Sequence, residues 1–164
     1  MTITNQKQAV NLRIVKSLVL LSLIILIGLI YFANVLRDGA LGYTRDQIAV
    51  SVIIFVVLFF IYHFIRDHYY IYYSDTGDNF ILRYFSLRPM TDKKNAIEFN
   101  KKELYSYEVT RSLHGLNKKL VIYRKTARGV AKYPPVSLTA LTKSDMEKIL
   151  ASMQRILIAN RASK

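Results

Sequence analysis

Long uncharged apolar runs dominate the first part of the chain. Residues 17–36 contain no charged side chain and consist mainly of Leu, Ile and Val, and residues 47–65 form a second run of the same kind. At about 1.5 Å of rise per helical residue, the first run covers roughly 30 Å, the thickness of the hydrocarbon core of a bilayer. The pattern therefore predicts two membrane-spanning helices, at 17–36 and 47–65.

The segment between the two runs is short, which predicts a transmembrane hairpin over residues 17–66. It reads RDGALGYTRD and carries equal numbers of acidic and basic residues. Basic residues flank the base of the hairpin, with Lys7, Arg13 and Lys16 before the first run and Arg66 after the second. Because cytoplasmic flanks are enriched in Lys and Arg, both termini are expected in the cytoplasm. A signal peptide is disfavoured, because the first run is longer than a typical h-region and no small-x-small cleavage site follows it.

After the second run the pattern changes to the alternation of β-strands. In HYYIYYS (68–74) and FILRYFSL (80–87), β-branched and aromatic residues dominate, and Gly77 and Asn79 lie between them in DTGDN. This arrangement predicts a β-hairpin. Pro134 and Pro135 lack an N–H for ladder hydrogen bonds, so their strand is expected at a sheet edge or broken there. Further strands are predicted at 96–100, 103–112, 118–124 and 130–138, which indicates a small antiparallel sheet or barrel.

The end of the chain has helical periodicity. Apolar residues recur at intervals of three and four, and Thr142 or Ser144 can cap the start of the helix. This amphipathic helix is expected to cover an open side of the sheet or barrel. The predicted fold class is an α+β membrane protein, with a two-helix transmembrane hairpin, a small antiparallel β-structure and a C-terminal helix. The apolar stripe of that helix consists of Met146, Ile149, Leu150, Met153, Ile156 and Leu157.

Charge is concentrated in the part that follows the hairpin. The chain has a net charge of +13, and residues 67–164 contain 18 Lys plus Arg against 9 Asp plus Glu. Cations near an anionic leaflet contribute on the order of 1 kcal/mol each, so a basic patch here predicts contact with membrane lipids or with a protein partner. The alternative is that these cations are solvated strand ends. The predicted patch consists of Lys118, Lys119, Arg124, Lys125 and Arg128.

Tyrosines lie at and beyond the ends of the predicted spans. The stretch RDHYYIYYSDTGDNFILRYF (66–85) interleaves aromatic and charged residues and begins where the second span ends. Amphipathic aromatic rings favour the boundary between membrane and water. The residues predicted at this boundary are Tyr31, Tyr62, Tyr69 and Tyr70.

Several functional classes are disfavoured by the residues. Aromatic and basic residues together can bind single-stranded nucleic acid, but here the aromatics alternate on both faces of predicted strands and no RNP1 run is present. The chain has no cysteine, and His63, His68 and His114 have no spacing that indicates shared metal ligation. No phosphate-binding glycine loop or G-x-S-x-G elbow occurs. We therefore expect no enzymatic activity, no cofactor and no nucleic-acid partner.

The order of elements resembles that of bacterial PH-like (pleckstrin-homology-like) domain membrane proteins. The segment YPPVSLTALTKSDMEKILASMQ (133–154) is similar to the last strand and capping helix of that family, and AIEFNKKELYSYEV (96–109) to a short strand and turn before a central strand. The apolar runs and the resemblance together predict residues 1–16 as a cytoplasmic segment, 17–66 as the hairpin and 67–164 as a PH-like domain. Phosphoinositide-binding PH domains carry basic residues at their first hairpin turn, whereas this chain has Asp75 and Asp78 there.

The resemblance implies a binding or scaffold role in place of catalysis. We expect a multi-pass protein of the bacterial inner (plasma) membrane, with a cytoplasmic PH-like domain that contacts lipids and binds a protein partner or further copies of itself. The alternative is a small accessory subunit of a larger membrane complex, because two spans without charged residues can pack on the helices of other subunits.

Overall fold

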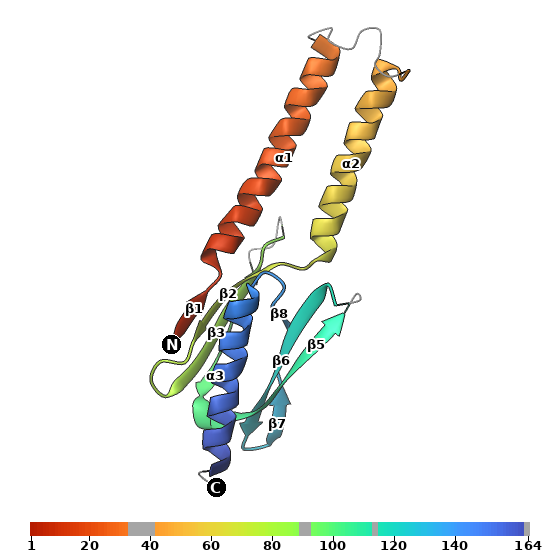
Figure 1. The fold of residues 1–164 in the computed structure, drawn as a ribbon. Coiled ribbons are helices and arrows are strands. Elements are labelled where there is room, and N and C mark those ends of the chain that lie inside the picture. The colour runs from red at the N-terminus through yellow and green to blue at the C-terminus, as the bar shows by residue number, and fades with distance from the viewer. Residues whose placement is uncertain (33–41, 89–92, 113–114, 163–164) are drawn as a thin grey trace. The chain divides into compact units, whose positions relative to one another are not determined.

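The computed structural model describes residues 1–32, 42–88, 93–112 and 115–162 (Figure 1). The chain folds as two compact units. One, which we call the β unit, is formed by Met1–Ala9 together with Arg66–Lys164. The other, the helix pair, is formed by Val10–Ile65.

The helix pair contains most of α1 (Gln6–Phe32) and all of α2 (Arg45–Ile65). Both helices are long and apolar enough to cross a membrane, and few of their apolar side chains are buried. Where α2 starts, the Tyr31 hydroxyl donates a hydrogen bond to Asp46 Oδ1 at 2.9 Å. The last part of the first predicted span, 33–36, and residues 37–41 of the predicted connection lie outside the described residues.

The β unit consists of two antiparallel sheets and one helix, which confirms the predicted α+β class. The first sheet has the order β1-β2-β3-β4, and in the second sheet β5 and β7 flank β6, with β8 also paired to β6. The strands are β1 (Thr2–Thr4), β2 (Tyr69–Ser74), β3 (Asn79–Ser86), β4 (Lys94–Asn100), β5 (Leu104–Ser112), β6 (Asn117–Thr126), β7 (Gly129–Lys132) and β8 (Val136–Ser137), and a 3-10 turn, η1 (Lys101–Glu103), joins the sheets.

The predicted strands are confirmed, including the interruption at the prolines. The strand expected at 130–138 is divided into β7 and β8, which pair with the same edge of β6 on either side of Pro134 and Pro135. Pairing continues across the gap, because Tyr133 N donates to Ile122 O at 2.9 Å. The predicted turn at Gly77 is present as well, with a positive φ of 69°.

Strand β1 was not predicted. It pairs with β2 so that Thr2 lies opposite Ser74 and Thr4 opposite Tyr72. Ile3 is buried in the core of the β unit. The N-terminal segment, expected to end at residue 16 as a separate piece, is therefore divided: Met1–Ala9 belongs to the β unit and the residues from Val10 onward to the helix pair.

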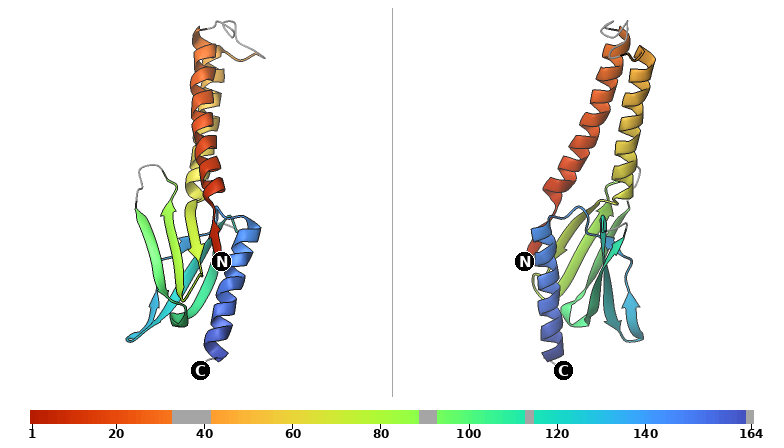
Figure 2. Two further views of the ribbon diagram at one scale, coloured as in Figure 1. Left: turned by 90° about the vertical axis from the view of Figure 1, so that its left-hand side faces the viewer. Right: turned by 45° about the vertical axis from the view of Figure 1, so that its right-hand side comes forward.

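Helix α3 (Lys143–Ala162) lies alongside the strands in all views (Figures 1 and 2). It contacts β5 and η1. The start is capped by Thr142, whose Oγ1 accepts a hydrogen bond from Asp145 N at 3.1 Å. The predicted stripe is confirmed, because Ile149, Met153 and Leu157 are buried in the core and Met146, Leu150 and Ile156 pack against it.

Candidate functional site

The β unit has two ends, and the chain connects to α1 and α2 at only one of them. Because β1 and β2 are antiparallel, the last residue before α1 lies beside the first residues after α2. We call this end, with Asn5, Asp67 and His68, the linker end. The opposite end, with the β2–β3 turn, η1 and the β6–β7 turn, we call the far end. Lys101 N donates to Asp78 O at the far end, and Leu87 N donates to His68 O at the linker end.

At the linker end, Asp67 fixes the point where α2 joins the sheet. It adopts a left-handed conformation with φ of 45°, which Asp tolerates better than most residues. Its carboxylate lies 2.5 Å from Arg88 Nη2 and 3.9 Å from Lys119 Nζ. The side chain therefore ties the segment that follows α2 to β6 and to the second residue after β3.

The predicted basic patch does not form one cluster. Its residues lie along β6 and in the turn after it. Lys118 and Lys125 are seven positions apart on this extended strand, roughly 23 Å. Lys118 and Lys119 lie at the linker end, whereas Lys125 and Arg128 lie at the far end. The fifth residue, Arg124, is engaged by the protein: its Nε lies 2.8 Å from Glu103 Oε2. The patch has to be treated as two separate surfaces.

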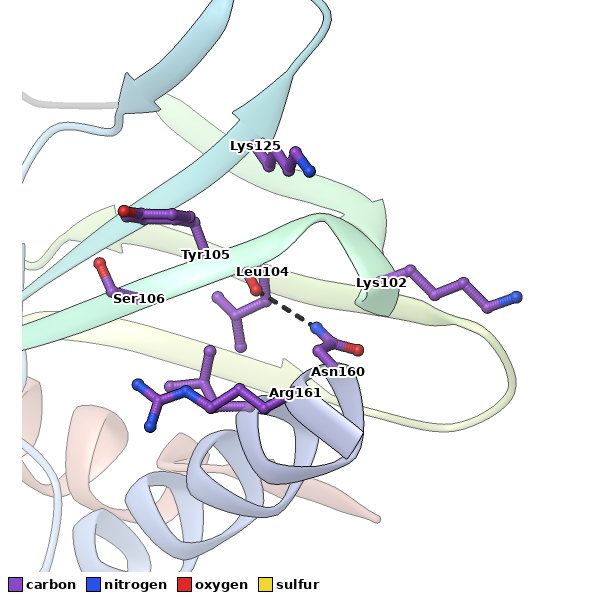
Figure 3. A pocket seen from close by; sticks show the side chains of 8 residues that line it. Lys102, Leu104, Tyr105, Ser106, Lys125, Asn160 and Arg161 are labelled. Carbon is purple, nitrogen blue, oxygen red and sulfur yellow. Dashed lines mark hydrogen bonds between the residues drawn. The ribbon is translucent and has the colours of Figure 1, made fainter. Parts of the chain in front are cut away.

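A pocket of about 420 Å³ opens at the far end, between η1, β5, β6 and the last turn of α3 (Figure 3). A β-bulge shapes it. Leu104 lies opposite Arg124 and Ser106 opposite Tyr123, so Tyr105 is an extra residue without a partner on β6. Bulges redirect side chains and are frequent beside functional sites. Tyr105 is 54% exposed and lines the pocket with Ser106.

Three cations from three elements surround this pocket. Lys102 comes from η1, Lys125 from β6 and Arg161 from α3 (Figure 3). The lining residues that the structure describes include no carboxylate. Asn160 fixes the wall, since its Nδ2 donates to Lys101 O at 2.8 Å and to Leu104 O at 3.2 Å. Positive charge, two hydroxyl groups and the apolar Leu104 and Leu157 suit an anionic group with a small apolar part.

Sequence reasoning identified only Lys125 among these pocket residues. Lys102 and Arg161 are distant from it along the chain, and strand pairing and the packing of α3 bring them together. No sequence signal marks Tyr105 as a bulge, because the residues on both sides of it continue the strand pattern.

The predicted interface tyrosines occupy two environments. Tyr31 and Tyr62 are exposed on the helix pair, and Arg45 lies 4.8 Å from the centre of the Tyr31 ring. Tyr69 and Tyr70 are sheet residues: their rings stack on those of Tyr84 at 6.0 Å and Phe85 at 4.7 Å, respectively. A role of these four residues at a membrane boundary stays a prediction.

A polar chain inside the β unit links strand β2 to α3. The Tyr73 hydroxyl donates to Ser152 Oγ at 2.9 Å, and Ser152 in turn donates to Asp75. Burial raises the pKa of Tyr73 to about 12, although the hydrogen bond with Ser152 acts in the opposite direction. Burial also acts to raise the pKa of Asp75, but hydrogen bonds from the Met1 amine and Ser152 outweigh it and lower this pKa. These contacts join elements of the fold and open onto no pocket described above.

Metal ligation and similarity to other proteins give no further assignment. Among the described residues, no three His, Asp or Glu side chains lie together as a metal ion would require. Comparisons of the chain with protein-family models, with curated proteins and with solved structures found no match.

Proposed function

We propose that this chain is a non-enzymatic protein of a bacterial inner membrane, in which α1 and α2 form a transmembrane hairpin and the β unit is a cytoplasmic, PH-like binding module. The order of elements supports the PH-like interpretation: two antiparallel sheets are followed by one helix that packs on β5. The basic flanks of the hairpin support the cytoplasmic side for the β unit.

One observation carries the tethering part of this proposal: both links to the helices leave from the same end of one sheet. Asn5 precedes α1 directly and bonds to β2. Asp67 follows α2 by two residues and pairs with Lys119 on β6. A module held at two adjacent points has far less freedom to rotate than one held by a single linker. The two links therefore tether the β unit by its linker end.

The far-end pocket is the binding site for a protein partner in this proposal. Three cations without a carboxylate attract an acidic group, and the apolar lining favours a side chain or chain terminus over a bare ion. Within the β unit, the pocket lies at the opposite end from the two links. Its partner is either another subunit or a second copy of the chain.

The test is the mass of the complex purified in mild detergent. We expect the wild-type chain to purify with one foreign subunit in a fixed ratio, or as a multiple of 19.0 kDa. The first result identifies an accessory subunit and the second a homo-oligomer. The variant K102E/K125E/R161E, which reverses the pocket charge, should run as the chain without its partner.

A matched control makes the same change in charge elsewhere. The variant K93E/K94E/R111E also replaces three cations by carboxylates, but at the linker end, and should keep the complex. The binding proposal is wrong if the wild-type chain is alone at 19.0 kDa plus detergent, or if both variants keep the partner equally well.

A further inference from the structure

We propose that the linker end of the β unit is a second membrane-binding surface, on which Leu116, the residue directly before β6, inserts among anionic lipid headgroups. This inference rests on the proposed transmembrane role of α1 and α2. It adds a specific lipid contact to the β unit. The two ends then have different ligands: the linker end binds lipid and the far end binds the protein partner.

The position of Leu116 follows from the strand register. Ser112 lies opposite Asn117, so Leu116, directly before Asn117, lies at the end of β6 that carries Lys118 and Lys119. Lys119 reaches Asp67, which follows α2 by two residues. Leu116 is thus at the end of the β unit from which the chain continues into the helices.

An exposed leucine lies in the described part of the segment between β5 and β6. Leu116 is 47% exposed and follows Gly115, whose φ is +86°. Polar residues are the usual choice at such tips. A single exposed apolar side chain is common on soluble proteins, so Leu116 alone indicates no partner. Its surroundings decide the interpretation.

Several cations lie at the same end of the β unit as Leu116. Arg111 and Lys118 are opposite each other on β5 and β6, close to the turn. Lys94 begins β4 opposite Phe85, with Lys93 before it. Asp67 is the acidic partner of Arg88 and Lys119. For Lys93, Lys94, Arg111 and Lys118, the described residues provide no carboxylate partner.

An apolar tip among cations fits an anionic bilayer surface better than a soluble partner. Basic side chains interact favourably with anionic headgroups, and burial of a leucine side chain at the boundary between headgroups and acyl chains lowers the free energy of the bound state. The two links to the proposed transmembrane helices also leave the β unit from this end. At the far end, Val130 offers the matched comparison: it is 49% exposed and pairs with Lys125, with Lys132 two residues further along β7.

The absence of cysteine allows a direct test on the full chain. Leu116→Cys and Val130→Cys are labelled singly with an environment-sensitive fluorophore. The protein is placed in nanodiscs of phosphatidylcholine alone or of an equimolar mixture with phosphatidylglycerol, each with a spin-labelled lipid as quencher. We expect lipid quenching of the label at 116 to exceed that at 130 several-fold in anionic nanodiscs. In phosphatidylcholine alone, or with K93E/K94E/R111E added, quenching at 116 should fall to near the level at 130.

Two results would overturn the lipid contact. Equal quenching at 116 and 130 in anionic nanodiscs would mean that residue 116 does not reach lipid. Strong quenching at 116 that changes neither with phosphatidylglycerol nor with charge reversal would mean that the links to the helices alone bring residue 116 to the lipid. Either result leaves the partner test at the far end unaffected, because that test is read from complex mass in detergent and from the far-end variant.

Discussion

Asn5 and Ile71 exchange two hydrogen bonds across the edge of the first sheet. Asn5 N donates to Ile71 O at 3.2 Å, and Ile71 N donates to Asn5 Oδ1 at 2.8 Å. The same side chain also donates from Nδ2 to Tyr69 O at 2.8 Å, and it is completely buried. The side-chain amide of Asn5 thus makes the hydrogen bonds to β2 that the backbone of one more β1 residue would otherwise make, at the point where β1 ends and α1 begins. It holds the two links of the β unit side by side.

Replacing Asn5 should loosen this junction. Asn5→Ala leaves two buried backbone groups without partners and should lower the free energy of unfolding of the β unit by about 3 kcal/mol. Asn5→Asp keeps the acceptor and loses the donor, so an intermediate loss is expected. The measurement is denaturant unfolding of the full chain in detergent, monitored through the near-UV circular dichroism of the tyrosines.

Thr4→Ala is the control for this prediction. Thr4 is exposed, and its hydroxyl makes one hydrogen bond with the Tyr70 hydroxyl at 3.2 Å. The expected loss is about 0.5 kcal/mol or less. Similar losses for Asn5→Ala and Thr4→Ala would contradict the role assigned to Asn5.

The polar chain of Tyr73 should make stability depend on alkaline pH. Tyr73 has a pKa of about 12 in the folded protein, against about 10 when unfolded. Its contribution is therefore fully present below pH 10 and is lost as the pH rises from 10 to 12, because only the unfolded chain ionises there. This amounts to about 2–3 kcal/mol of unfolding free energy.

Tyr73→Phe removes the titrating group and should flatten this part of the pH profile. At neutral pH the variant should lose about 1 kcal/mol, since its hydrogen bond to Ser152 is gone. Burial also raises the pKa values of Tyr69 and Tyr84, so some alkaline loss should remain. A profile with the wild-type slope between pH 10 and 12 would refute the assignment to Tyr73.

The bulge at Tyr105 should be needed for partner binding but not for the stability of the fold. Deleting Tyr105 brings Leu104 and Ser106 into regular register with Arg124 and Tyr123. We expect a stability within about 1 kcal/mol of wild type and loss of the partner complex in mild detergent. Deleting Tyr107 should instead be severely destabilising, because a shift by one residue turns the neighbouring side chains to the wrong face. Retention of the partner by the Tyr105 deletion would exclude the bulge from the binding site.

Elements with long, regular patterns could be predicted from the sequence. The uncharged runs mark α1 and α2, and alternation marks the strands from Tyr69 onward. Strand β1 was missed because Thr2–Thr4 is only three residues long and its partner is about 70 residues further along the chain. The available signal was weak: three residues, two of them Thr and one Ile, followed by Asn5, which can begin a helix.

The candidate surfaces depend on pairing that local sequence does not encode. Lys118 and Lys125 are close in the chain, yet an extended strand places them at opposite ends of β6. Lys102 and Arg161 are far apart in the chain, yet η1 and α3 bring them to one pocket. The sequence predicts that basic residues lie in turns and at strand ends. Which of them lie together depends on strand order and on the packing of α3.

Labelling from one side of the membrane tests the central claim most directly. Tyr43→Cys, in the described part of the connection between α1 and α2, and Ala127→Cys, in the β6–β7 turn, give two exposed thiols in a chain that has none of its own. An impermeant maleimide should label Tyr43→Cys in intact spheroplasts and Ala127→Cys only after they are permeabilised. Labelling of Ala127→Cys in intact spheroplasts would contradict a cytoplasmic binding module held by a transmembrane hairpin.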